Sequence, residues 1–230
     1  MTAIFYDPEA YSTQGSRLMG RNAAGKYFLD GFLAYSKSGS TLYAQVATAA
    51  QAAQFKETLL LNFREEQTKF FTVKNLQVAI EAEAIYYPGP DIAKQCFQRQ
   101  LFGEDLWSLC GITHTTSSAA AMDAIASWVT SPVQPWDAVI CTSTAVKKNV
   151  EVLLQAQVDS LKDRLGITKI ILPQLPVIPL GVQTKDFSYN PEQRTKARAS
   201  LNATEDTLVV LYTGRLSFHA KAHPLAMYQA

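Results

Sequence analysis

The residues in this 230-residue sequence that are best suited to chemistry lie in short clusters that follow apolar runs. One cluster holds Gly214, Arg215 and Lys221, directly after the apolar run 207–213. A glycine lets backbone amides approach a ligand, an arginine bridges two phosphate oxygens, and a lysine adds a compact charge. This loop suits a diphosphate, although a solvated basic turn has the same composition.

A second cluster, residues 14–21, contains Gly15, Gly20 and Arg21 and leads into a helix-like segment. The backbone amides of such a loop and the N-terminus of the following helix favour a phosphate or a carboxylate. The spacing is neither that of the G-x-G-x-x-G dinucleotide fingerprint nor that of a Walker A loop. Gly15 and Gly20 as ordinary turn glycines are the alternative interpretation.

His114, one of three histidines, follows the continuous apolar run 106–113. A histidine at the end of a buried strand can donate hydrogen bonds to ligand hydroxyls or to developing charge. The alternative is a structural histidine whose ring is satisfied by its surroundings. Cys141 and the hydroxyl residues 142–144 follow a further apolar run, and helix capping explains those hydroxyls.

Several classes of site are disfavoured. The cysteines Cys96, Cys110 and Cys141 form no CxxC or Cys/His cluster, so we expect buried, reduced thiols and neither disulfides nor zinc. No histidine or arginine lies near Cys141 in the sequence to activate it as a nucleophile. The sequence also lacks an Asp-x-Asp motif and a G-x-S-x-G elbow. We therefore expect no metal, no cofactor and no hydrolase chemistry.

The charge balance narrows the class of partner. Lys and Arg total 21 against 20 Asp and Glu, for a net charge of +1. No stretch has the basic excess of a nucleic-acid binder or of a polybasic membrane patch. The N-terminus has no signal-peptide pattern, and no apolar run approaches the roughly 20 residues that span a bilayer. These features predict a cytoplasmic protein with no nucleic-acid partner and no transmembrane segment.

Short apolar runs alternate with longer segments of helical periodicity, which predicts an α/β fold: a Rossmann-like, mainly parallel sheet with helices on both faces. Ligands in such sheets bind beyond the carboxyl ends of the strands, where the clusters above begin. Strands are expected over 2–6, 41–47, 76–80, 85–87, 106–113, 138–141, 169–172, 177–178 and 207–213. Helices are expected over 21–36, 49–61, 92–101, 119–129, 145–165, 190–200 and from 223 onwards, with 7–20 as a loop.

Five segments occur in an order that resembles a known family: GRNAAGKYFL, THT, WDAVICTSTAV, LPVIPLGV and VVLYTGRLSFHAK. They resemble the retaining glycosyltransferases of family 4, which have the GT-B fold. The resemblance implies two Rossmann-like domains that face each other across a cleft, the first binding the acceptor and the second a nucleotide-diphosphate sugar. It implies an acceptor-side domain over 1–181, a linker with a helix over 182–203, and the truncated start of the donor domain over 204–230.

The resemblance also assigns roles to residues. His114 would contact the transferred sugar, and Arg215 and Lys221 would hold the donor diphosphate and stabilise the leaving nucleotide. The other expected binding residues are Gly15, Gly20, Arg21 and Gly214. Without a metal motif, these cations and helix N-terminal amides would offset the leaving group's charge. No carboxylate stands out as a nucleophile, which favours retention by reaction at the front face of the donor.

Some positions depart from the family pattern. Pro179-Leu180-Gly181 stands where a Pro-Asn-Gly turn is usual, and Gln183 replaces the Asp that often follows. The second domain's pair of glutamates is absent from these 230 residues, so we expect little or no transferase activity from this chain alone. The acceptor class, whether carbohydrate, lipid or small molecule, stays open.

Two other functions compete with the transferase. One is a non-catalytic, acceptor-binding remnant. The other is a nicotinamide- or flavin-dependent oxidoreductase of the same fold class. The long loop after Tyr6 and the sequence 47–49, which lacks an acidic residue, disfavour the oxidoreductase.

Overall fold

The computed structural model describes residues 1–14, 19–212 and 225–229. The chain divides into two compact units, Met1–Val182 and Gln183–Ala230, which are treated separately below. Among the described residues, no helix is both long enough and apolar enough to cross a bilayer. The same residues contain no group of three or more metal-ligating side chains placed to hold an ion.

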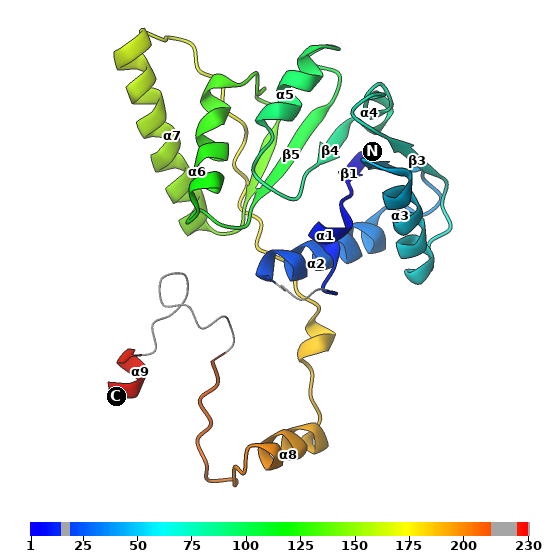
Figure 1. Ribbon diagram of the computed structural model, residues 1–230, viewed down its shortest axis with the longest axis vertical. Helices are drawn as coiled ribbons and strands as arrows, with labels where there is room; N and C mark the ends of the chain where they lie inside the picture. Colours follow the sequence, from blue (N-terminus) through cyan, green and yellow to red (C-terminus); the bar gives the residue numbers. More distant parts are fainter. Residues whose placement is uncertain (15–18, 213–224, 230) are drawn as a thin grey trace. The chain divides into compact units, whose positions relative to one another are not determined.

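The first unit is built on a six-stranded sheet in which every neighbouring pair is parallel (Figure 1). The strand order is β3-β2-β1-β4-β5-β6, the order of a Rossmann fold. This confirms the predicted α/β, Rossmann-like class. The strands are β1 (Thr2–Phe5), β2 (Leu42–Gln45), β3 (Thr68–Phe71), β4 (Ala84–Tyr86), β5 (Ser108–Thr113) and β6 (Ala138–Cys141).

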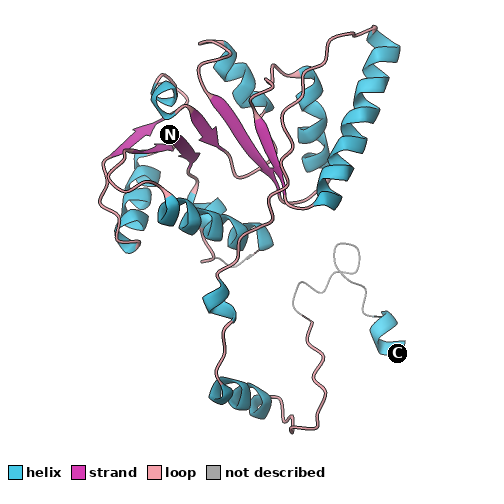
Figure 2. Ribbon diagram, turned by 180° about the vertical axis from the view of Figure 1, so that it is seen from behind, coloured by secondary structure: helices cyan, strands magenta, loops and turns pink. Residues whose placement is uncertain are grey.

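One face of the sheet packs against the helices that follow β3, β4, β5 and β6, and Trp128, Ile125 and Leu154 are among the side chains buried there. These helices are α4 (Val78–Ala82), α5 (Ala93–Gln100), α6 (Ala119–Ala126) with the 3₁₀ turn Ser127–Thr130, and α7 (Thr144–Leu165) (Figure 2). The hydroxyl of Ser143 accepts a hydrogen bond from the amide of Val146 and caps α7, as predicted.

The opposite face packs against α1 (Pro8–Tyr11), α2 (Gly20–Tyr35) and α3 (Ala49–Leu61). Leu29 and Leu33 of α2 and Phe55 of α3 are buried in this core. Cys110 of β5 and Ile140 of β6 also face this side, but they are only half-buried. The helices of this face therefore leave part of β5 and β6 uncovered.

A fully buried ion pair fixes the start of β5 beside β6. The guanidinium of Arg99 donates two hydrogen bonds to the carboxylate of Asp137, at 2.6 and 2.8 Å. The same carboxylate accepts the backbone amides of Leu109 and Gln134, each at 2.8 Å. All four contacts lie at the amino ends of the strands, so they set the register on which the opposite edge depends.

Some predicted elements are wrong. The expected strand 76–80 is helical, because Val78–Ala82 forms α4 and Glu83 ends it with a left-handed φ of 63°. The strand beside β2 is instead β3, which was not predicted. The loop 7–20 contains the short helix α1.

The expected strand 169–172 is not formed, and the expected strand 177–178 is reduced to a single bridge from Val177 to Cys141; a second bridge joins Gln174 to Ala138. Three prolines in this segment lack the amide hydrogen that a continuous ladder requires.

In the second unit, α8 (Pro191–Ser200) begins at Asn190, whose side chain accepts the amide hydrogen of Gln193. The unit also contains the 3₁₀ turn Thr184–Phe187 and α9 (Leu225–Gln229). The predicted strand 207–213 is not formed over residues 207–212, whose apolar side chains are exposed. Residue 213 lies outside the described part.

Candidate functional site

The candidate site lies beyond the carboxyl ends of β1, β4 and β5, at the point between β1 and β4 where the order of the strands reverses. A small cavity of about 190 Å³ opens there. Connections from β1 and β4 leave on opposite faces, which creates a crevice in this type of sheet. The cavity is lined by Asp7, Glu9, Ala10, Arg21, Pro88 and His114.

His114 follows β5 and is largely buried. The preceding residue, Thr113, is fully buried and donates its hydroxyl hydrogen to the carbonyl of Ile140 at 3.0 Å, which anchors this turn to β6. The Nδ1 atom of His114 is buried and has no hydrogen-bond partner among the described residues. Because Nδ1 is shielded from solvent, a ligand in the cavity would meet another edge of the His114 ring, which lines the cavity.

Burial lowers the pKa of His114 below its usual value near 6.5. A contact with the backbone of Pro88 opposes this shift, and the positive charge of Arg21 adds to it. The ring is therefore mainly neutral at pH 7. A neutral imidazole has one donor and one acceptor nitrogen, so it can bind a hydroxyl group without adding charge.

Asn22 positions Arg21 at the start of α2. Its side-chain oxygen accepts the amide hydrogen of Met19 at 3.1 Å, and its nitrogen donates to the carbonyl of Glu9 at 2.7 Å. The Arg21 guanidinium lies 4.0 Å from the Glu9 carboxylate, and both side chains are mostly exposed. Because such pairs contribute little, a ligand anion can compete for the guanidinium.

The close packing of α2 on α1 depends on Gly25. A Cβ atom at this position would overlap the carbonyl oxygen of Ala10, which is a backbone atom and cannot move aside cheaply. By contrast, a Cβ on Gly20 would meet nothing within 4 Å, and Gly20 has no left-handed φ. Gly25 therefore brings Arg21 and Glu9 to one cavity, while no described neighbour requires glycine at position 20.

The loop after β4 is held against β5 at close range. A Cβ on Gly111 would lie 2.7 Å from the carbonyl oxygen of Gly89, and that oxygen accepts the amide hydrogen of Ile112 at 3.0 Å. The indole of Trp128 donates to the carbonyl of Pro90 at 2.9 Å. These contacts place Pro88 beside His114.

Of the predicted site residues, His114 and Arg21 line the same cavity, and Gly20 is the first residue of α2. The structure does not describe the rest of that prediction, namely Gly15, Gly214, Arg215 and Lys221. The cavity also includes Asp7 and Pro88, which the sequence analysis did not single out. Asp7 directly follows the expected strand 2–6, and Pro88 directly follows the expected strand 85–87. Because ligands in such sheets bind beyond the carboxyl ends of the strands, these positions were a signal that could have found both residues.

The thiols show no sign of activation. Burial raises the pKa of Cys96 to about 12 and that of Cys110 to about 11, and it also raises the pKa of Cys141. All three are free cysteines. A thiol with a raised pKa is a poor nucleophile at neutral pH.

The strand order and the position of the cavity place this chain among the Rossmann-like α/β proteins. Among solved structures it is similar to Alr3699/HepE of Anabaena in complex with UDP, with 17% identity and a TM-score of 0.52. A crystal structure of the same protein with UDP and glucose gives 17% identity and a TM-score of 0.49. Both matches cover 88% of this chain and 50% of the other, so the chain spans half the length of HepE. No family model and no curated protein matches the sequence.

Proposed function

We propose that the chain is the acceptor-side part of a retaining glycosyltransferase of the GT-B type, similar to family 4, that uses a nucleotide-diphosphate sugar. The observation that carries the proposal is the pairing of a neutral His114 with Arg21 at the switch point of the sheet. A further support is the fold shared with HepE, a protein solved in complex with UDP.

His114 suits a sugar hydroxyl better than it suits a phosphate. Its lowered pKa keeps the ring neutral, and the ring lines the cavity beside Arg21. In the proposed reaction, His114 is a binding group that orients the transferred sugar. Hydrogen bonds aimed at the reacting sugar accelerate transfer when they are stronger in the transition state than in the bound substrate.

The charge that develops on the leaving diphosphate requires cations. Arg21 is the described cation at the cavity, and it stands on the first turn of α2, whose N-terminal amides carry positive partial charge. We assign the remaining stabilisation to Arg215 and Lys221, with Gly15, Gly20 and Gly214 allowing close backbone approach to the diphosphate. In this proposal the reaction needs no metal ion.

The sugar would be transferred with retention, at the face of the donor from which the diphosphate departs. The acceptor hydroxyl would attack the anomeric carbon as the bond to the diphosphate oxygen breaks, and its proton would pass to that leaving oxygen. Residues 204–230 would begin the donor domain, and this 230-residue chain would have little or no transferase activity by itself.

Saturation-transfer NMR with UDP-glucose as the probe tests the proposal on the 230-residue chain. The expected result is transfer to the hexose protons, with affinity about threefold to tenfold weaker in His114→Ala and in Arg21→Ala, the loss typical of one hydrogen bond. Arg164→Ala is the matched control, because Arg164 is an exposed arginine at the end of α7 and does not line the cavity. Equal binding in the wild type and in both site variants would refute the assignment.

A second assay follows release of UDP from UDP-glucose in the presence of mixed acceptors. We expect no rate above background from the 230-residue chain. A catalytic rate from this chain would contradict the proposal that these 230 residues do not suffice for transfer by themselves.

A further inference from the structure

A long apolar trough begins at His114, which also lines the charged cavity of the candidate site. It consists of two adjoining cavities of about 250 and 760 Å³. Phe28, Phe32, Tyr86 and Ile140 line both, so the two cavities share walls and run into each other. We call this feature the α2 trough. His114 lies at its inner end, and the segment 36–41 after α2 lies at its outer end.

The trough exists because one face of the sheet is incompletely covered. A parallel sheet is normally packed on both faces. Here Cys110 and Ile140 are only half-buried, although both project onto the face that α2 covers. The floor of the trough is therefore formed by side chains of β4, β5 and β6 that project onto this face and are left uncovered. One wall is formed by the aromatic side chains of α2.

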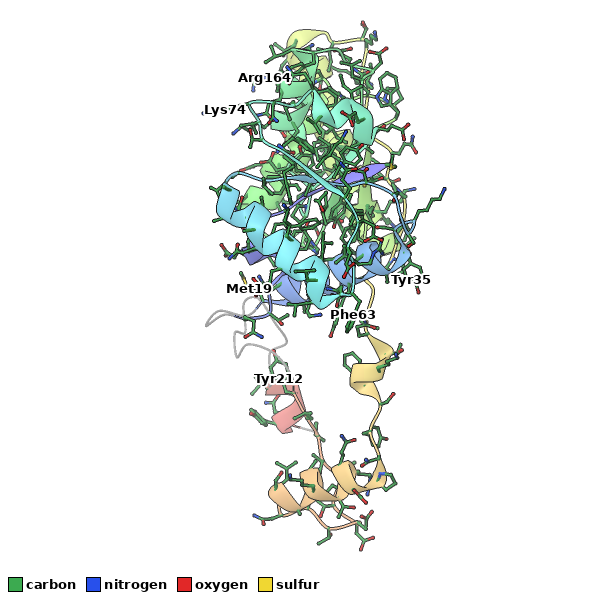
Figure 3. The ribbon with its side chains drawn as sticks, turned by 90° about the vertical axis from the view of Figure 1, so that its right-hand side faces the viewer. Met19, Tyr35, Phe63, Lys74, Arg164 and Tyr212 are labelled. Atoms are coloured by element: carbon green, nitrogen blue, oxygen red, sulfur yellow. The ribbon has the colours of Figure 1, made fainter. Side chains whose placement is uncertain are left out.

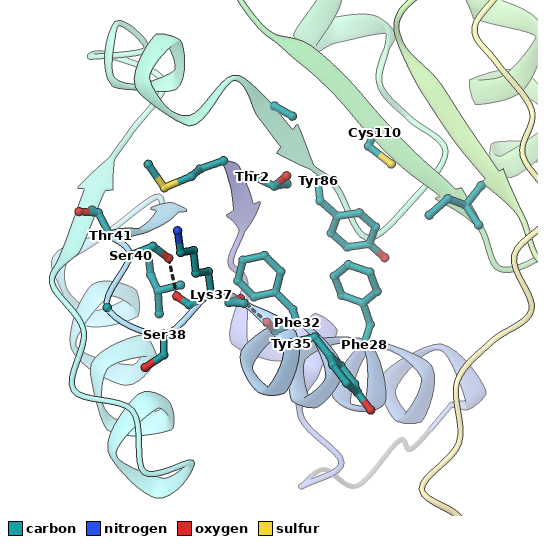
Figure 4. Close-up of a pocket in the computed structure, with 16 residues that line it drawn as sticks. Thr2, Phe28, Phe32, Tyr35, Lys37, Ser38, Ser40, Thr41, Tyr86 and Cys110 are labelled. Atoms are coloured by element: carbon teal, nitrogen blue, oxygen red, sulfur yellow. Dashed lines mark hydrogen bonds between the residues drawn. The ribbon is translucent and has the colours of Figure 1, made fainter.

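Polar and apolar groups are separated along the trough. Figure 4 shows the rings of Phe28 and Tyr86 stacked against each other over the floor, with Phe32 beside them. The polar side chains of Lys37 and Ser40 belong to the outer rim. The charged cavity with Arg21 and His114 adjoins the inner end. From Ala24 to Ser36 along α2, this path is about 18 Å long.

The outer end opens beside exposed aromatic side chains. Tyr35, the last residue of α2, is 92% exposed, and Phe63 is 95% exposed. Arg64 donates hydrogen bonds to the carbonyls of Leu33 and Ser36, which brings the segment after α3 against this end of α2 (Figure 3). Exposed aromatic residues of this kind are enriched where proteins meet a lipid surface.

We infer that the acceptor is a membrane lipid, whose hydrocarbon chain lies in the α2 trough and whose polar head reaches His114. The inference rests on the function proposed above. Three observations favour this occupant: continuity of the trough with the charged cavity, an apolar interior with polar groups at the rim, and exposed aromatic residues at the mouth. The acceptor hydroxyl on the head group would then stand next to the sugar that His114 orients.

Calorimetric titration of the 230-residue chain with n-alkyl β-glucosides, from methyl to decyl and below their micelle concentrations, tests the inference. Burial of each added methylene predicts roughly fourfold tighter binding until the trough is filled. Ile140→Trp, placed where the two cavities meet, should abolish the dependence on chain length. Ala84→Phe, which lines only the outer cavity, should weaken decyl glucoside at least about tenfold and leave the short glucosides unchanged.

Val152→Trp is the matched control, since Val152 is exposed on α7 and lines neither cavity. Thermal unfolding followed by circular dichroism shows whether each variant is folded, and Ala84→Phe decides the question if Ile140→Trp does not fold. Affinity that does not depend on chain length would overturn the inference. So would a dimer that the alkyl glucosides dissociate, because a second copy would then be the occupant.

Binding of UDP-glucose is measured in the same samples to separate the two proposals. Loss of chain-length dependence with intact UDP-glucose binding refutes the lipid acceptor alone. Absence of UDP-glucose binding with intact chain-length dependence refutes the donor-binding role proposed for His114 and Arg21 and leaves a lipid-binding trough.

Discussion

Replacing Asp137 by alanine tests whether the buried ion pair positions the strand that carries His114. The side chains of Asp137 and Arg99 are both 0% exposed, and the carboxylate accepts four hydrogen bonds. In Asp137→Ala, the guanidinium would stay buried without its counter-charge, which typically costs about 3–5 kcal/mol. The amides of Leu109 and Gln134 would also lose their acceptor, at about 1–3 kcal/mol for each buried group left unpaired.

These effects are not additive, because water can enter the vacated space, so we expect a loss of at least about 4 kcal/mol in the free energy of unfolding. For a domain of this size, that corresponds to a fall in Tm of about 10 °C or more. Urea unfolding followed by tryptophan fluorescence and circular dichroism measures it. Asp163→Ala, at an exposed position of α7, is the control and should change stability by less than about 0.5 kcal/mol.

The double variant Arg99→Met with Asp137→Leu separates charge from hydrogen bonding. It removes both charges, but it leaves the amides of Leu109 and Gln134 without an acceptor. It should therefore recover only part of the loss and remain about 2 kcal/mol or more below the wild type. A loss below about 1 kcal/mol in Asp137→Ala would refute the reasoning, since a buried guanidinium cannot be left unpaired so cheaply.

Three further predictions concern pH, packing and the thiols. The pKa of His114 is lowered in the folded protein, so protonation of the ring opposes folding. The stability of the protein is therefore full above about pH 6.5 and falls as the pH drops below that value. NMR titration should trace this pH dependence to the His114 ring, and the dependence should be missing in His114→Gln. Gly25→Ala should destabilise by about 2 kcal/mol or more, since its Cβ overlaps the Ala10 carbonyl, whereas Gly31→Ala on the same helix meets open space and should be neutral or stabilising in thermal unfolding. Cys96, which is fully buried and has a pKa raised to about 12 by burial, should react with DTNB at pH 7.5 much more slowly than after unfolding in urea; equal rates would contradict its burial.

Local patterns in the sequence were sufficient to predict most elements of the first unit. The spacing of apolar residues along α2 and α7 and the short apolar runs of β1, β5 and β6 predicted their types correctly. The capping of α7 by Ser143 could also be predicted from the sequence, because a helix cap is a contact between residues three positions apart. The alternation of strands and helices along the chain then predicted the parallel α/β class.

The errors occurred where local patterns were ambiguous. The segment 76–80 is as apolar as a strand, yet it forms the helix α4. β3 was missed because two of its four residues, Thr68 and Lys69, are polar, so its apolar part is only the pair Phe70 and Phe71. Elements this short carry too few residues to distinguish a period of two from a period of 3.6.

The sequence by itself determined that His114 lies at the ligand edge of a sheet, because a polar residue after a buried strand must stand at that strand's carboxyl end. Only the tertiary structure decided that Arg21 shares its cavity, since the two residues are brought together by the order of β1, β4 and β5 and by the fit of Gly25 against α1. The α2 trough likewise depends on which strands α2 leaves uncovered. Periodicity records how each segment buries its own apolar face, whereas strand order and helix coverage are set by contacts between segments far apart in the chain, and no local pattern encodes them.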